Sequence, residues 1–115
     1  MNLHPRLTNI NSKIEFVCRK IESLGGICMK YEIDKMIYVE LERLFKAYWI
    51  FKHKELNAKE DKKVKEIISS SFYRLNKWEV PYDIQNLILQ LANIKTNKDR
   101  CFKDILRLKG IRVIL

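Results

Sequence analysis

Residues 64–78, which read VKEIISSSFYRLNKW, decide the fold of this chain. Their apolar side chains recur at the three- and four-residue spacing of a single helix face. Asn57 and Glu60 precede the stretch at capping-box spacing, in which each side chain accepts a hydrogen bond from the other residue's backbone N–H. We therefore predict a long amphipathic helix with a defined start. Its expected inward face is Val64, Ile67, Ile68, Ser71, Phe72, Leu75 and Trp78.

The same period recurs on both sides of this helix. It predicts four more helices, over residues 12–24, 34–51, 81–94 and 99–109. Glycines follow the first and the last of these, and Pro81 suits a helix start, where its missing N–H costs nothing. Only three glycines and two prolines occur, which argues against a turn-rich β fold. We predict an all-α fold, a right-handed bundle of five helices.

Three segments fit this scheme less well. Residues 1–11 have no periodicity, and we expect an extended arm before a single helical domain at residues 12–115. Residues 27–33 alternate like a short strand, but a lone strand would have no partner, so we interpret them as an irregular lead-in to the second helix. Residues 111–115 (IRVIL) are largely apolar. Either they fold back onto the core, or the chain is a fragment of a larger solenoid.

Composition restricts the class of protein. No segment approaches the roughly 20 apolar residues of a membrane span, and none resembles a signal peptide. We expect an intracellular protein, nuclear or cytoplasmic, that does not bind membranes. Cys18, Cys28 and Cys101 lack the spacing of a metal site, so we expect reduced thiols in core positions.

The sequence contains no arrangement typical of catalysis. His4 and His53 each stand alone, and the serines at 69–71 have no histidine nearby. The glycines at 25–26 follow a helix, whereas a phosphate-binding loop opens one. Glu40 and its charged neighbours have the spacing of a solvated, salt-bridged helix face. We therefore predict no enzyme activity, no small-molecule substrate, no cofactor and no metal.

Positive charge gathers towards the ends of the chain. The net charge is +9, and residues 95–115 hold seven basic against two acidic side chains. Helical spacing places Arg100, Lys103 and Arg107 on one face of the last predicted helix. Such a stripe is either the solvated face of a surface helix or a contact for an acidic partner or a phosphate backbone. With its neighbours, the predicted basic stripe is Lys95, Lys98, Arg100, Lys103, Arg107 and Arg112, and Lys109 lies beside it.

A second group combines aromatic rings with cations. Tyr48, Trp49 and Phe51 lie beside Lys52, His53 and Lys54. Rings among cations stack on bases or grip a peptide anchor. The alternative is that these rings are the end of a buried helix.

Two segments share the pattern Ile-x-x-Leu-x-Gly-Ile, at residues 21–27 and 105–111. Together with residues 86–94 and Cys101, this pattern resembles an armadillo repeat. Residues 64–78 also resemble, more weakly, the closing helix of the N-terminal helical bundle of transcription elongation factors. The resemblance implies a short armadillo-like solenoid as the alternative to a bundle, and a scaffold that grips linear segments of partner proteins.

We accordingly expect a non-catalytic protein-interaction module that binds an acidic or linear-motif partner, in transcription or chromatin machinery. One alternative is a nucleic-acid-binding protein whose basic ends contact phosphates, with an affinity that falls steeply as salt rises. The other is a small viral or structural interaction subunit.

Overall fold

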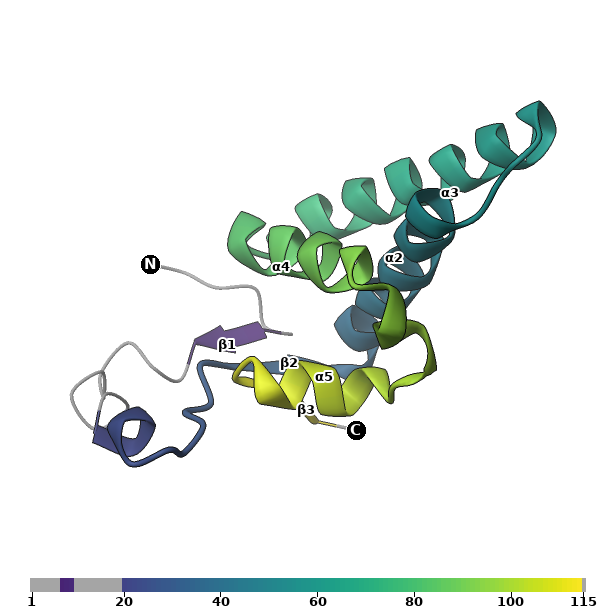
Figure 1. Ribbon diagram of the computed structural model, residues 1–115. Helices are drawn as coiled ribbons and strands as arrows, with labels where there is room; N and C mark the ends of the chain where they lie inside the picture. Colours follow the sequence, from purple (N-terminus) through teal and green to yellow (C-terminus); the bar gives the residue numbers. More distant parts are fainter. Residues whose placement is uncertain (1–6, 10–19, 115) are drawn as a thin grey trace. The chain divides into compact units, whose positions relative to one another are not determined.

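The computed structural model describes residues 7–9 and 20–114 (Figure 1). The predicted mainly helical fold is confirmed, with a small sheet added to it. The chain divides into two compact units, residues 39–100 and residues 1–38 with 101–115. The elements in chain order are β1 (Leu7–Asn9), β2 (Tyr31–Asp34), α2 (Lys35–His53), α3 (Ala58–Lys77), α4 (Tyr82–Asn93), the 3₁₀ helix η1 (Lys95–Asp99), α5 (Phe102–Leu108) and β3 (Ile111–Ile114).

Side-chain caps define the starts of α3 and α2. The Asn57 side chain accepts from Glu60 N at 2.8 Å and the Glu60 side chain accepts from Asn57 N at 3.2 Å, so the capping box of α3 is confirmed. At the start of α2, Asp34 Oδ1 accepts from Ile37 N at 3.0 Å. Pro81 was predicted as the first residue of α4, but it is the N-cap, and the helix begins one residue later at Tyr82. The predicted helix over residues 12–24 is described only at its end, where residues 20–23 are helical.

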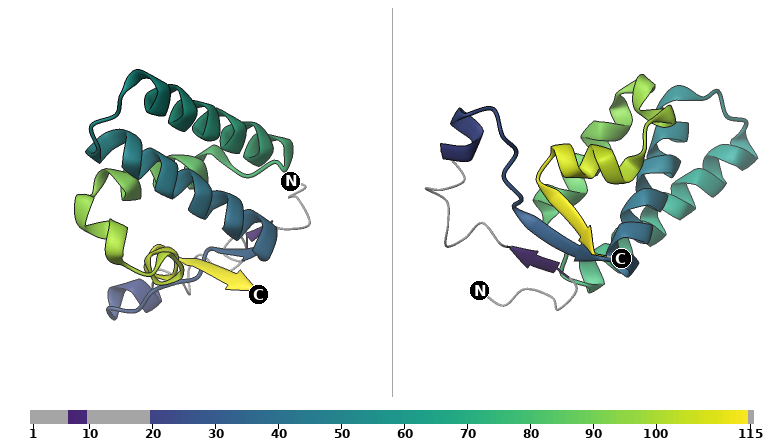
Figure 2. Two further views of the ribbon diagram at one scale, coloured as in Figure 1. Left: turned by 90° about the vertical axis from the view of Figure 1, so that its right-hand side faces the viewer. Right: turned by 90° about the horizontal axis from the view of Figure 1, so that it is seen from below.

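The unit at residues 39–100 consists of most of α2 with α3, α4 and η1 (Figure 2). Polar side chains join its elements at specific points. His53 Nε2 donates to the Ala92 carbonyl at 2.9 Å, and Gln85 Nε2 donates to Asn76 Oδ1 at 2.8 Å. Asn97, in η1, donates to the Leu91 carbonyl at 2.9 Å. The apolar core between them contains Leu41, Leu44, Phe45, Ala47, Trp49, Leu75, Val80, Ile84, Ile88, Leu91 and Ala92.

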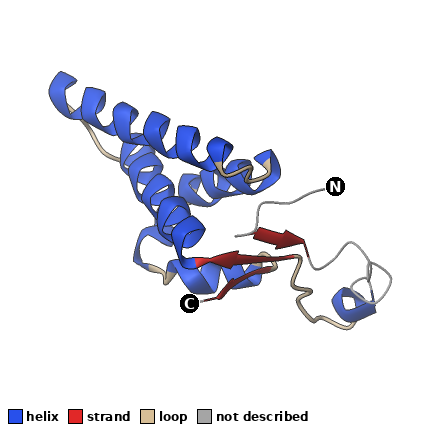
Figure 3. Ribbon diagram, turned by 180° about the vertical axis from the view of Figure 1, so that it is seen from behind, coloured by secondary structure: helices blue, strands red, loops and turns tan. Residues whose placement is uncertain are grey.

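The other unit contains a three-stranded sheet in the order β1-β2-β3, which the sequence did not predict (Figure 3). β1 pairs antiparallel with β2, Leu7 opposite Ile33, and β3 pairs parallel with β2, Ile33 opposite Val113. The expected irregular lead-in at residues 27–33 is therefore wrong for residues 31–33. The strand has partners, but they lie at the two ends of the chain. Of the two fates considered for residues 111–115, the strand at 111–114 corresponds to folding back, with Ile111 and Val113 buried.

Gly110 makes the turn from α5 into β3. Its φ of +82° is favourable only for glycine, and a Cβ at this position would lie 2.7 Å from the Cys28 carbonyl oxygen. The Gly110 carbonyl also accepts hydrogen bonds from Lys30 N at 2.6 Å and Tyr31 N at 3.1 Å. One residue thus ends the helix and lets β3 approach the chain that leads into β2.

We predict that Gly110→Ala lowers the free energy of unfolding by about 3 kcal/mol, from left-handed strain plus the forced movement of the Cys28 backbone. Gly25→Ala is the matched control, because Gly25 has a φ of +84° but nothing within 4 Å of its added Cβ. The control should lose only about 1 kcal/mol. Urea denaturation measures both, and equal losses would show that the close approach at Gly110 does not matter.

α3 ends one residue before Trp78, the last residue of its predicted inward face. The helix ends at Lys77, and Glu79 follows in a left-handed conformation with a φ of 57°. Val80 N donates to the Leu75 carbonyl and Glu79 N to the Asn76 carbonyl, both at 3.0 Å, which is the Schellman pattern. Glutamate therefore occupies a position that favours glycine.

Replacing the exposed Glu79 by glycine should stabilise the protein by about 0.5 kcal/mol, because relief of left-handed strain exceeds the added chain entropy of the unfolded state. Lys77→Gly, two residues earlier and still helical, should instead destabilise by about 1 kcal/mol. Thermal melts of the two variants test the opposite signs.

The cysteines only partly match the expectation of reduced core thiols. Cys28 is buried, as predicted, but it is disulfide-bonded. Cys101 is a free thiol, but it is exposed as the N-cap of α5. Cys18 lies outside the described residues. Of the two described cysteines, core placement therefore holds for Cys28 and the reduced state for Cys101.

Candidate functional site

The predicted basic stripe is divided among several elements. Lys95 and Lys98 lie in η1, and Arg100 is the C-cap of η1. Lys103 and Arg107 lie in α5 and Arg112 lies in β3. The prediction that Arg100, Lys103 and Arg107 share one helix face is wrong for Arg100, because α5 begins only at Phe102. The polar residues before it form a separate 3₁₀ helix.

Three residues of the stripe line one hollow in the unit that contains the sheet. This hollow, of about 300 Å³, lies against α5 and β3, and we call it the α5–β3 hollow. Its lining residues are Lys103, Asp104, Arg107, Ile111, Arg112 and Val113. Three cations therefore face one carboxylate there.

The cations of the hollow differ in how they are held. Arg112 Nη2 lies 3.0 Å from Glu32 Oε2, and this ion pair joins β3 to the neighbouring β2. Lys103 and Arg107 lie one turn apart on α5, are exposed, and make no ion pair with another described residue. Arg112 thus already has a carboxylate partner, while Lys103 and Arg107 remain available to an external anion.

The predicted aromatic group lies near the C-terminal end of α2. Trp49 is only 6% exposed, and its Nε1 donates to the Lys95 carbonyl at 3.0 Å. Its ring lies 4.8 Å from the His53 ring. Tyr48 and Phe51 are half-buried, with ring centroids 6.0 Å apart. The position of Trp49 therefore matches the end of a buried helix, which was the alternative interpretation.

Lysine ammonium groups lie over each of these rings. Lys98 Nζ is 4.9 Å from the Trp49 ring centroid and Lys54 Nζ is 5.9 Å from it. Lys52 lies 5.5 Å from the Tyr48 ring, and Lys65 lies 5.9 Å from the Phe51 ring. These cation–π contacts occupy ring faces that a nucleic-acid base would need for stacking.

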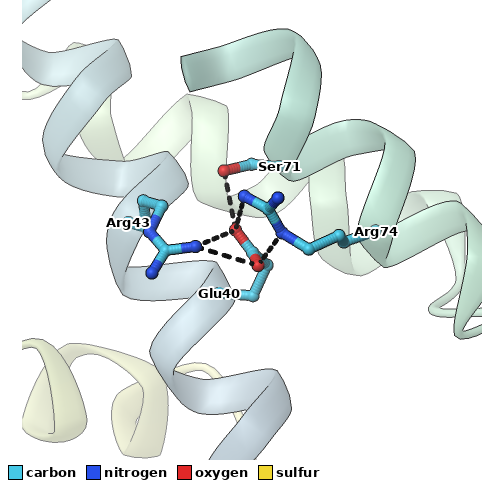
Figure 4. Close-up of polar contacts among 4 residues, drawn as sticks. All are labelled: Glu40, Arg43, Ser71 and Arg74. Atoms are coloured by element: carbon cyan, nitrogen blue, oxygen red, sulfur yellow. Dashed lines mark hydrogen bonds and ion pairs between the residues drawn. The ribbon is translucent and has the colours of Figure 1, made fainter.

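Glu40 is the polar centre of the unit at residues 39–100, and sequence reasoning missed it. The sequence placed it on a solvated face, but it is only 3% exposed. Figure 4 shows Arg43 from α2 and Ser71 and Arg74 from α3 converging on its carboxylate. Ser71 Oγ donates at 2.8 Å, Arg74 donates through Nε and Nη2, and Arg43 Nη1 lies 3.3 Å from Oε1. The apolar neighbours Ile37, Leu41 and Leu44 were the local sign of burial.

The surroundings of Glu40 favour its charged form. Burial alone raises the pKa of the Glu40 carboxyl. Hydrogen bonds from Arg74 and Ser71, with the charges of Arg43 and Arg74, outweigh burial and hold that pKa below its ordinary value. The hydrogen bond to Glu40 in turn raises the pKa of the Arg74 guanidinium. This network therefore fixes α2 against α3, and no group in it is held ready for proton transfer.

We predict that Glu40→Gln lowers the free energy of unfolding by about 2 kcal/mol at neutral pH. Because the folded pKa is depressed, the charged carboxylate stabilises the fold fully above the ordinary glutamate pKa of about 4.3. That contribution is lost as the pH falls through the lower folded pKa, so the difference between variant and wild type should shrink below about pH 4.

Urea denaturation over a pH series measures this difference. The exposed Glu66, on α3, provides the control, and Glu66→Gln should change the free energy of unfolding by less than about 0.5 kcal/mol. A Glu40→Gln loss that is the same at every pH would contradict the charge-based explanation.

The part of the chain that the structure describes holds no group of three or more His, Cys, Asp or Glu side chains able to bind a metal ion. No described helix has the length and apolarity needed to cross a membrane. Comparisons with known protein families, curated proteins and solved structures found no match. The resemblance to armadillo repeats therefore stays a prediction.

Proposed function

We propose that this chain is a non-catalytic interaction module that binds an acidic segment of a partner protein at the α5–β3 hollow. The observation that carries the proposal is the arrangement of Lys103 and Arg107, exposed and without an ion pair among the described residues, beside Arg112. Two cations one turn apart match carboxylates spaced along a peptide. Recognition of linear segments is also what the armadillo resemblance implies.

The number and setting of the cations favour a protein over a nucleic acid. The hollow offers three cations against one carboxylate. Tight binders of duplex DNA contact roughly 6–10 phosphates. Bases would also need open ring faces, but the rings of Tyr48, Trp49 and Phe51 already carry lysine ammonium groups. An acidic peptide needs neither a long track of cations nor a stacking platform.

We expect a fluorescently labelled peptide of alternating glutamate and serine to bind the protein at low salt, and the double variant Lys103→Glu, Arg107→Glu to weaken this binding about tenfold. The reason is that two attractive contacts become repulsive, and about 1.4 kcal/mol corresponds to a factor of ten. Fluorescence anisotropy measures the dissociation constant. Binding should also weaken as salt is raised.

The control is the double variant Lys62→Glu, Lys63→Glu, which makes the same change in net charge at exposed positions of α3. It should bind the peptide within about twofold of wild type, since the hollow is intact. Equal weakening of peptide binding by the two variants would show that the peptide responds to the net charge of the protein and not to the hollow. Tighter binding of generic duplex DNA or RNA than of the peptide, lost in the first variant, would favour the nucleic-acid alternative instead.

A further inference from the structure

The sheet has an open edge at β3, next to the α5–β3 hollow. β2 pairs with β3 on one side, and no strand among the described residues pairs with β3 on the other side (Figure 3). An open edge presents backbone N–H and C=O groups that can pair with a further strand. The edge at β3 therefore offers hydrogen-bonding groups in addition to the charges of the hollow.

The hydrogen bonds to β2 determine which residues of β3 face the open edge. The Gly110 carbonyl accepts from Tyr31 N at 3.1 Å, and the register is parallel, with Tyr31 opposite Ile111. The backbone groups of successive strand residues point alternately to the two sides of the strand, so those of Arg112 also point to β2. The N–H and C=O groups of Ile111 and Val113 point to the open edge, where they make no hydrogen bond with another described residue.

The hollow follows the course of β3. Successive side chains of a strand point to opposite faces of its sheet. Ile111 and Val113 are buried on one face, whereas the Arg112 side chain is 60% exposed and lies beside Glu32 on the other. All three consecutive residues of β3 nevertheless line the hollow. A chain segment placed in the hollow would therefore lie beside the backbone of β3.

Two cations without a carboxylate partner border the hollow from α5. Lys103 and Arg107 make no ion pair with another described residue, and Asp104, which also lines the hollow, is paired with neither. Lys103 and Arg107 lie about 6 Å apart along the helix axis. Side chains two residues apart in a strand lie about 7 Å apart on one face. Alternate acidic residues of an extended segment therefore match these two cations without displacing the ion pair of Arg112.

We propose that the acidic segment of the partner binds as an additional β-strand along β3. This inference rests on the proposed function and adds to it the conformation of the segment and the backbone groups that hold it. The N–H and C=O groups of Ile111 and Val113 pair with the backbone of the segment, and Lys103 and Arg107 bind its alternate carboxylates. In such strand addition the backbone hydrogen bonds supply affinity, and the side chains supply specificity.

The charges of the hollow favour an acidic segment over a second copy of this chain as the added strand. A two-fold contact between two β3 edges would satisfy the backbone groups of both copies. It would also bring Lys103 and Arg107 of both copies to the same edge, and Asp104 is the one carboxylate that each hollow contains. An acidic extended segment supplies both the backbone groups and the carboxylates.

Methylation of the peptide backbone tests the strand pairing without any change to the protein. The probe is the peptide of alternating glutamate and serine, in two matched versions. One version carries N-methyl groups on its glutamates, and the other carries them on its serines. In an extended peptide these two sets of N–H groups point to opposite sides, so only one set faces β3. We expect one version to bind at least about tenfold more weakly than the other, as measured by fluorescence anisotropy.

The outcomes separate this inference from the proposed function. The direction of the added strand decides which set of N–H groups faces β3, so a loss in either version alone supports the proposal. Equal affinities of the two methylated versions would overturn strand addition, while binding of the unmethylated peptide would leave the proposed function intact. If the unmethylated peptide does not bind, both fail.

NMR of the complex gives an independent measurement on the protein. With isotopically labelled protein and unlabelled peptide, the amide protons of Ile111 and Val113 should show nuclear Overhauser effects to backbone protons of the peptide. The amide proton of Arg112, which faces β2, is the internal control and should show none. Contacts of the bound peptide with β1 or with α5 side chains alone would overturn the proposal. The same contacts between labelled and unlabelled protein without peptide would assign the edge to a second copy instead.

Discussion

The arrangement of α2 and α3 depends on the hydrogen bonds and ion pairs of the Glu40 carboxylate. A charge buried between two helices is tolerated only when donors surround it, and here Arg43, Ser71 and Arg74 supply them. A sliding of α3 along α2 would leave the carboxylate without donors from α3. Apolar packing alone is compatible with several such shifts, whereas the polar network is compatible with only one register of α3 against α2.

This constraint extends from the core to the surface. Arg43 belongs to the Glu40 network and also lines a groove along α2 and α3. On the other side of α2, Trp49 donates to the Lys95 carbonyl, and Lys98 covers its ring. Two exposed cations of this unit, Arg43 and Lys98, are therefore placed by contacts with buried side chains.

The unit that contains the sheet depends on backbone geometry instead. The left-handed conformation of Gly110, with its closeness to Cys28, brings β3 beside β2. That pairing puts Arg112 opposite Glu32 and places it at the same hollow as Lys103 and Arg107. The basic character of the C-terminal segment thus becomes a defined surface only because the segment folds back as a strand.

Local patterns in the sequence were enough to predict α2, α3, α4 and most of α5. The apolar period of residues 64–78 and the capping box of Asn57 and Glu60 were correctly predicted, because helix hydrogen bonds and caps join residues three or four positions apart. The end of α5 before Gly110 was also predicted from the sequence, since a left-handed backbone conformation favours glycine. The composition also determined the excess of positive charge.

Only the tertiary structure decided where those elements and charges meet. The sheet joins segments from both ends of the chain, and residues 31–33 alone gave no sign of their partners. Glu40 was predicted to be a surface residue because its hydrogen-bond donors Ser71 and Arg74 lie 31 and 34 positions away in the sequence. The basic stripe was divided for the same reason, since a break between Asp99 and Phe102 separates Arg100 from α5. Burial, strand pairing and the surroundings of a charge depend on non-local contacts, which periodicity along the chain does not encode.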